Sequence, residues 1–154
     1  MSSRVIVLGV GNAERGDDGV GRVVAGLLRD VTSDRVNVLE KDGEATSLLA
    51  ALEGAAVGYI VDACVSGAPA GTVHRIDVHE NPLPQVSSDL STHGFGLAAA
   101  IELGRALGQL PARTIVYAIE GKYFEAGAAL SEPIAAAAAA VAERIRSEIA
   151  ADLA

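Results

Sequence analysis

The chain is poor in cysteine, aromatic residues and positive charge, and each shortage limits what kind of protein it can be. Cys64 is the only cysteine among the 154 residues, so no internal disulfide can form, and we expect a reducing, cytoplasmic compartment. Aromatic residues make up 3% of the chain, which predicts a core of Ala, Val, Leu and Ile. The formal net charge of -8, without a cluster of Lys or Arg, argues against a nucleic acid or an anionic membrane surface as the partner.

Long apolar runs are also lacking. No stretch reaches the roughly 18 apolar residues of a membrane span, and residues 1–10 are too sparsely apolar for a secretory signal. Half of the residues are nevertheless hydrophobic, which is enough for a sizeable core. We therefore expect one domain over residues 1–154, away from membranes.

Strand-like and helix-like segments alternate along the chain. Continuous aliphatic runs predict strands, and apolar stripes at helical spacing predict helices. The expected strands are 5–8, 36–39, 56–61, 71–78 and 113–119, and the expected helices are 18–29, 46–52, 94–107 and 131–150. The connection between the third and fourth strands is too short for a helical crossover, so we expect these two to be antiparallel. The pattern predicts an α/β fold, with a mixed, mainly parallel sheet and helices on both faces.

A glycine-rich turn follows the first strand and ends in two acids. Gly9 and Gly11 resemble the start of a dinucleotide-binding motif, but Glu14 occupies the third glycine position, and no phosphate-binding Gly-Lys-Ser/Thr sequence is present. Asp17 and Asp18 stand where a helix N-terminus normally attracts an anion. This arrangement suits a cation better than a phosphate, so we expect no nucleotide cofactor.

Three side chains are expected at the carboxyl ends of strands, where ligands of open α/β sheets bind. Asp18 follows the first strand, Asp62 closes the third, and His93 precedes the helix that leads into the fifth. Two carboxylates and one imidazole form a mixed N/O set that leaves coordination positions open, as in reactive metal sites. The sequence therefore predicts a metal-contacting and catalytic site formed by Asp18, Asp62 and His93.

Each of these residues also has a structural explanation when it is taken alone. Asp18 can contribute favourable charge at a helix N-terminus, worth about 0.3–1 kcal/mol. Asp62 can end a strand as a turn residue, and His93 can begin a helix with its ring satisfied. Asp17 is expected to cap the following helix while Asp18 points to the site. The functional interpretation depends on the three residues meeting at one edge.

The remaining nucleophilic and imidazole side chains are expected to play other roles. We expect Cys64 to be a small buried thiol rather than the nucleophile of a Cys–His pair, because no local motif accompanies it. His74 and His79 are expected on the surface. No Gly-x-Ser-x-Gly motif occurs, which argues against an α/β-hydrolase triad.

Read in order, the motifs resemble those of the hydrogenase maturation endopeptidase family. The resemblance covers nearly the whole chain and is carried by LGVGN at residues 8–12, DDGVG at 17–21, VDA at 61–63, STHG at 91–94, AIE at 118–120 and LSEP at 130–133. It implies a single-domain three-layer sandwich with a twisted five-stranded sheet. It also implies an endopeptidase that removes the C-terminal extension of a [NiFe]-hydrogenase large-subunit precursor after nickel insertion.

The resemblance assigns the metal-contacting roles to Asp18, Asp62 and His93, with nickel supplied by the substrate. Two departures stand out: Asp18 replaces a Glu that is frequent in the family, and residues 40–44 read EKDGE in place of an Asp-Gly-Gly-type turn. The expected protein is a monomer with no organic cofactor, and its site binds metal only weakly in isolation. The alternatives are a non-enzymatic nickel-binding assembly factor and a nucleotide-binding regulator.

Overall fold

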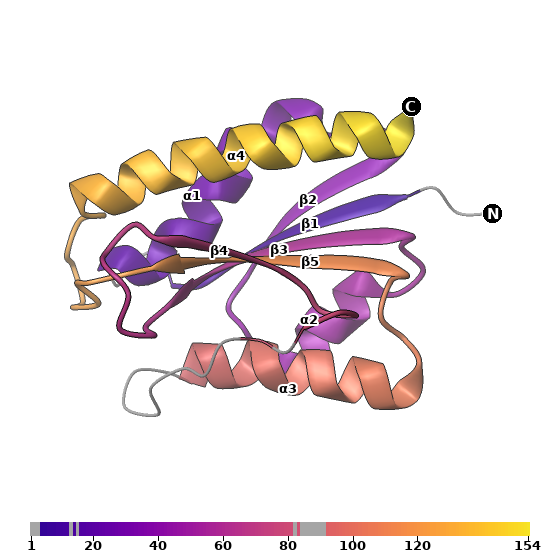
Figure 1. The fold of residues 1–154 in the computed structure, drawn as a ribbon, viewed down its shortest axis with the longest axis horizontal. Helices are drawn as coiled ribbons and strands as arrows, with labels where there is room; N and C mark the ends of the chain where they lie inside the picture. Colours follow the sequence, from indigo (N-terminus) through magenta and orange to yellow (C-terminus); the bar gives the residue numbers. More distant parts are fainter. Residues whose placement is uncertain (1–3, 13, 15, 82, 84–91) are drawn as a thin grey trace.

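A five-stranded sheet forms the middle layer of the molecule, with helices on both faces (Figure 1). The computed structural model describes residues 4–12, 14, 16–81, 83 and 92–154, of which 92–96 are described by their backbone alone. The described strands are β1 (Val5–Val10), β2 (Val36–Lys41), β3 (Val57–Cys64), β4 (Val73–Asp77) and β5 (Arg113–Glu120). The α-helices are α1 (Val20–Leu27), α2 (Ala45–Leu52), α3 (Thr92–Leu107) and α4 (Glu132–Leu153), and short 3-10 turns cover Gly16–Gly19 and Arg29–Val31.

The strand order is β2-β1-β3-β5-β4, and only β4 runs antiparallel to its neighbour β5. The predicted direction of the fourth strand relative to the third is confirmed, but β5 lies between them. β5 is almost entirely buried and apolar, so it takes a position with both edges paired and both faces covered. β4 is shorter and partly exposed, which suits the edge of the sheet.

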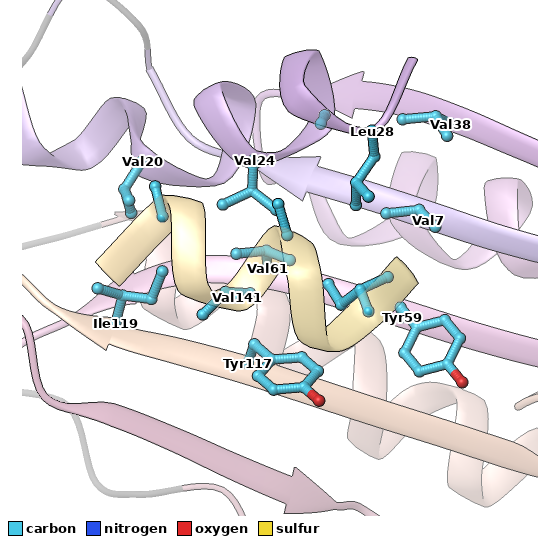
Figure 2. Packing of buried hydrophobic residues seen from close by; sticks show 14 of the residues in the cluster. Val7, Val20, Val24, Leu28, Val38, Tyr59, Val61, Tyr117, Ile119 and Val141 are labelled. Carbon is cyan, nitrogen blue, oxygen red and sulfur yellow. The ribbon is translucent and has the colours of Figure 1, made fainter. Parts of the chain in front are cut away.

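Two apolar clusters hold the layers together, one on each face of the sheet. Helices α1 and α4 cover one face, and α2 and α3 cover the other. Figure 2 shows the first cluster, where Val24 and Val141 pack from the two helices over Val61 of β3. The core is mainly aliphatic as predicted, with Tyr59 and Tyr117 as its largest side chains. Their hydroxyl groups point out of the cluster and donate to carboxylates of α4.

The predicted elements are all present, and the differences lie at their ends. β3 continues to Cys64, so Asp62 lies inside the strand rather than closing it. The first helix begins at Val20, after a separate 3-10 turn that carries Asp17 and Asp18. Part of the predicted loop 79–92 lies outside the described residues. Among the described helices, none combines the length and apolarity needed to cross a membrane.

Candidate functional site

Asp18 and Asp62 meet at the edge of the sheet where β1 and β3 end. Asp18 belongs to the 3-10 turn between β1 and α1, and Asp62 lies near the end of the adjacent strand β3. Both side chains are buried, with 5% and 2% of their surface exposed. They are close enough for the charge of Asp18 to raise the pKa of Asp62. The structure therefore brings together the two carboxylates that the sequence placed at this edge.

Glycines allow the helix that follows Asp18 to rest directly on the strands. A Cβ on Gly21 of α1 would lie 2.3 Å from the carbonyl oxygen of Val61 and 2.4 Å from that of Val10. A Cβ on Gly9 would lie 2.2 Å from the carbonyl oxygen of Gly21. These contacts leave no space for a side chain at either position. The close approach sets the start of α1, and with it Asp18, beside the end of β3.

The glycine turn that resembles a nucleotide motif is also explained by packing. Gly11 has a φ of +141°, and a Cβ on it would lie 1.9 Å from the backbone carbonyl oxygen of Asp18. The space next to Gly11 is thus filled by the 3-10 turn at Gly16–Gly19. The amide of Asn12 donates to the Asp18 carboxylate at 3.2 Å, which fixes the acid against this turn. The two glycines therefore serve the packing of the acidic turn.

Asp62 carries a buried oxygen that has no partner among the described residues. Its Oδ1 accepts a hydrogen bond from the backbone amide of Ala63 at 2.8 Å, whereas Oδ2 is buried without a hydrogen bond there. Burial raises the pKa of Asp62 well above its usual value, and the neighbouring charge of Asp18 raises it further. A buried, unpaired carboxylate oxygen is costly for stability, so this atom marks a place for a cation or a proton.

Asp17 is not a helix cap, contrary to the prediction. Gly19 is the residue that precedes α1, and the described residues provide no side-chain cap for that helix. The Asp17 carboxylate instead accepts hydrogen bonds from the amides of Lys122, Tyr123 and Ser131 and from the Ser131 hydroxyl. Asp17 therefore ties the acidic turn to the segment between β5 and α4. The two adjacent acids thus have different surroundings: Asp17 is hydrogen-bonded to this segment, whereas the charge of Asp18 acts on Asp62.

His93 lies in the first turn of α3, which begins at Thr92. Figure 1 shows that α3 starts at the side of the molecule where β3 and β5 end. The start of α3 therefore lies on the side of the sheet that the sequence predicts for the site. The side chain of His93 lies outside the described part of the structure, so its contact with the two carboxylates remains a prediction.

A second group of polar side chains was missed by the sequence reasoning. His74 was expected on the surface, but its side chain is only 29% exposed, and its Nε2 lies 2.9 Å from Oε1 of the buried Glu120. The prediction overlooked strand alternation, because His74 lies two residues before the buried Ile76 and so shares its face. His79 is exposed, as predicted.

Cys64 is buried beside the same glutamate. Burial raises the pKa of its thiol, and the negative charge of Glu120 raises it further. The thiol is therefore protonated at neutral pH and is no activated nucleophile. The expectation of a small buried thiol is confirmed. Glu120 also accepts hydrogen bonds from the amide and the hydroxyl of Ser66.

The fold and the paired acids define an α/β protein with a carboxylate site at the carboxyl edge of its sheet. A profile of the family described as hydrogenase maturation protease matches residues 22–148. The chain belongs to this family. The match includes Asp62 and His93 and begins after Asp18.

One related sequence and two solved structures are also similar to this chain. The hydrogenase expression/formation protein HupD of Thiocapsa roseopersicina is 30% identical over 118 residues, which are 75% of this chain and 53% of that protein. The chain thus spans about half the length of that relative. The hydrogenase maturating endopeptidase HybD of E. coli shares the fold, with a TM-score of 0.83 and 24% identity over 95% of this chain and 91% of that one. The [NiFe] hydrogenase maturation protease HybD of Thermococcus kodakarensis has a TM-score of 0.76 and 25% identity, over 95% and 99%.

Proposed function

We propose that this protein is an endopeptidase that removes the C-terminal extension of a [NiFe]-hydrogenase large-subunit precursor after nickel insertion. Family membership supports the class of reaction and the class of substrate. The observation that carries the proposal is the buried Oδ2 of Asp62, which has no hydrogen-bond partner within the described part of the chain and lies near the second buried acid, Asp18. A folded protein keeps such an arrangement at a cost in stability, and functional sites are where that cost is commonly found.

The nickel ion belongs to the substrate in this proposal. Carboxylate oxygens from Asp18 and Asp62 and a ring nitrogen from His93 would complete the coordination of a nickel already bound by the precursor. Three protein ligands leave positions for the donors that the precursor supplies. Precursors without nickel would then dock weakly, so that cleavage follows metal insertion. The separate protein is expected to bind nickel only weakly at these residues.

Two mechanisms fit the paired acids. In the first, the nickel or one carboxylate activates a water molecule for attack on the scissile carbonyl. In the second, Asp18 and Asp62 act as a base and an acid, and the nickel only positions the peptide. The raised pKa of Asp62 suits a proton donor and supports the second mechanism. A nickel-free precursor held in place by a covalent tether separates activation of the water by nickel from the routes that use the carboxylates alone, because only the latter allow it to be cut.

The test is a cleavage assay followed by intact mass spectrometry. Purified protein is mixed with the nickel-loaded and the nickel-free precursor, and the loss of the C-terminal extension is measured. We expect shortening of the nickel-loaded form only, and loss of that activity by at least 100-fold in Asp18→Asn, Asp62→Asn and His93→Ala. Binding of the precursor without shortening would instead indicate a nickel-dependent assembly factor.

Two matched control variants separate the site from general effects of charge and imidazole loss. Asp34 is exposed and precedes β2, and His79 follows β4, so both lie at the opposite edge of the sheet. Asp34→Asn and His79→Ala should cleave like the unmodified protein. Equal losses in the controls and the site variants would contradict the assignment of the site.

The proposed setting is the cytoplasm, which the single, buried cysteine supports. The protein is proposed to act as a monomer, which its net negative charge supports.

A further inference from the structure

Three side chains of metal-binding type converge beside the site without belonging to it. Cys64 of β3 lies opposite Glu120 of β5, and His74 of β4 lies opposite Ala118 of the same strand. Their ligand atoms, one each from the thiol, the imidazole and the carboxylate, all lie within 4.8 Å of one another. Strand alternation places all three on the face of the sheet that α2 and α3 cover.

We propose that Cys64, His74 and Glu120 bind a divalent transition-metal ion, with zinc as the best chemical match. Zinc accepts sulfur, nitrogen and oxygen ligands together, whereas magnesium and calcium prefer oxygen alone. A thiolate and a carboxylate supply two negative charges, which balance the charge of the ion. Binding releases the thiol proton of Cys64 to solvent, and the metal–sulfur bond takes its place.

The geometry needs little adjustment to hold the ion. Zinc bond lengths of about 2.0–2.3 Å in a tetrahedral site place the ligand atoms roughly 3.3–3.8 Å apart. His74 Nε2 and Glu120 Oε1 are 2.9 Å apart, and no pair in the cluster exceeds 4.8 Å. Shifts of about 1 Å or less in side-chain position therefore open the site. His74 is on the edge strand, where such a shift disturbs the fewest neighbours.

The surroundings of Glu120 resemble the second layer of contacts that orients a metal ligand. The amide of Ser66 donates to both carboxylate oxygens at 3.2 and 3.0 Å, and the Ser66 hydroxyl donates to Oε1. The amide of Gly121 donates to the carbonyl oxygen of Cys64 at 3.0 Å and fixes that backbone. Such outer contacts hold a ligand in place before the metal arrives.

Access and an open coordination position are both available at His74. Glu120 and Cys64 are 1% and 5% exposed, whereas the His74 side chain is 29% exposed. An ion can enter from the His74 side, and a water molecule can complete a fourth position there. The bound ion would connect the edge strand β4 to β3 and β5, so we expect it to stabilise the fold.

This site is separate from the proposed catalytic residues. Asp62 and Cys64 lie two positions apart on β3, which is about 7 Å along a strand. The two sites also differ in chemistry, because only the second contains sulfur. Cys64 is the only cysteine of the chain, so any metal–thiolate signal reports this site alone.

The experiment is a titration of the metal-free, reduced, full-length protein with cobalt(II), which replaces zinc and gives a visible spectrum. We expect a thiolate-to-cobalt charge-transfer band in the near ultraviolet that saturates at one ion per chain and disappears when zinc is added. The band should persist in Asp62→Asn, which lacks a ligand of the other site, and vanish in Cys64→Ser. Zinc should raise Tm in the unmodified protein and in Asp62→Asn.

His74→Asn and its matched control His79→Asn test the ligand set. Loss of the His74 ring should weaken cobalt binding by about 10-fold or more, while His79→Asn should bind like the unmodified protein. Glu120→Gln should weaken binding similarly, with circular dichroism used to check its fold. The proposal is overturned if no charge-transfer band forms, or if the band forms with the same affinity in His74→Asn. It is also overturned if the zinc-dependent rise in Tm depends on Asp62 and not on His74.

Discussion

Ser131, the residue before helix α4, donates both its amide and its hydroxyl to Asp17, 114 positions earlier in the chain. Ser131 occupies the N-cap position of this helix. Its hydroxyl nevertheless serves the acidic turn instead of the helix. This contact joins the first glycine turn to the start of the last helix, across the edge of the sheet that carries the site.

The Asp17 contacts predict a loss of stability in Asp17→Asn. The carboxylate is fully buried, and an amide nitrogen in place of one oxygen would face donors from Lys122, Tyr123 or Ser131. We expect the free energy of unfolding at pH 7 to fall by about 1–3 kcal/mol. Chemical denaturation with urea measures this. An unchanged unfolding midpoint would contradict the structural role of Asp17.

The same residue predicts a dependence on pH. Burial alone would raise the pKa of Asp17, but the hydrogen bonds from Ser131, Tyr123 and Lys122 lower it below the ordinary 3.8. A depressed pKa in the folded state stabilises the protein above the ordinary value, and this contribution disappears as the pH falls below it. The difference in Tm between the protein and Asp17→Asn should therefore be constant near neutrality and shrink below pH 3.8.

Asp62 predicts the opposite effect on stability. Its pKa is raised by burial and by Asp18, so the free energy of unfolding falls as the pH rises above the ordinary pKa of 3.8. Asp62→Asn should raise the free energy of unfolding by about 1–3 kcal/mol while it abolishes cleavage. The gain should grow as the pH rises above 3.8 and be absent below it. Thermal unfolding of metal-free protein across this pH range is the measurement, and a variant less stable than the parent at pH 7 would contradict the prediction.

Two glycines of α1 form a matched pair of test positions. Gly21→Ala places a methyl group 2.3 Å from the carbonyl oxygen of Val61, so α1 must move away and carry Asp18 with it. We expect lower stability and lower cleavage activity. Gly26→Ala on the same helix meets nothing within 4 Å and should stabilise the protein by about 0.5–1 kcal/mol with cleavage unchanged. Similar behaviour of the two variants would show that the close approach is unimportant.

Glu148 of α4 provides a test away from the site. It accepts hydrogen bonds from the buried Tyr117, from Arg75 and from Arg113, and its side chain is 19% exposed. Glu148→Gln should cost about 1–3 kcal/mol in unfolding free energy. Glu143→Gln on the same helix removes a 73% exposed carboxylate and should change stability by less than about 0.5 kcal/mol. Thermal unfolding of both variants is the measurement, and equal losses of stability would contradict the role of the buried hydrogen bonds of Glu148.

Local patterns in the sequence were sufficient for the elements and the layers. Strand β1 was predicted from an aliphatic run and helix α4 from an apolar stripe. Burial imposes a characteristic spacing of apolar residues, which differs between a strand and a helix. The position of Asp18 and Asp62 at one edge follows as well, since parallel strands end on the same side. The position of β5 between β3 and β4 does not follow, because pairing partners are selected by burial of whole strands.

The class of fold, the acidic turn and the pair of carboxylates at the edge of the sheet follow from the order of the residues alone. Only the tertiary structure divided the adjacent acids into one that accepts hydrogen bonds from four donor groups of the β5–α4 segment and one whose charge acts on Asp62. It also brought Cys64, His74 and Glu120 together. The physical reason is the same in both cases. Two residues that are adjacent in sequence take on different roles when their hydrogen-bond partners come from segments more than forty positions away. Such long-range contacts cannot be predicted from the spacing of apolar residues along the chain.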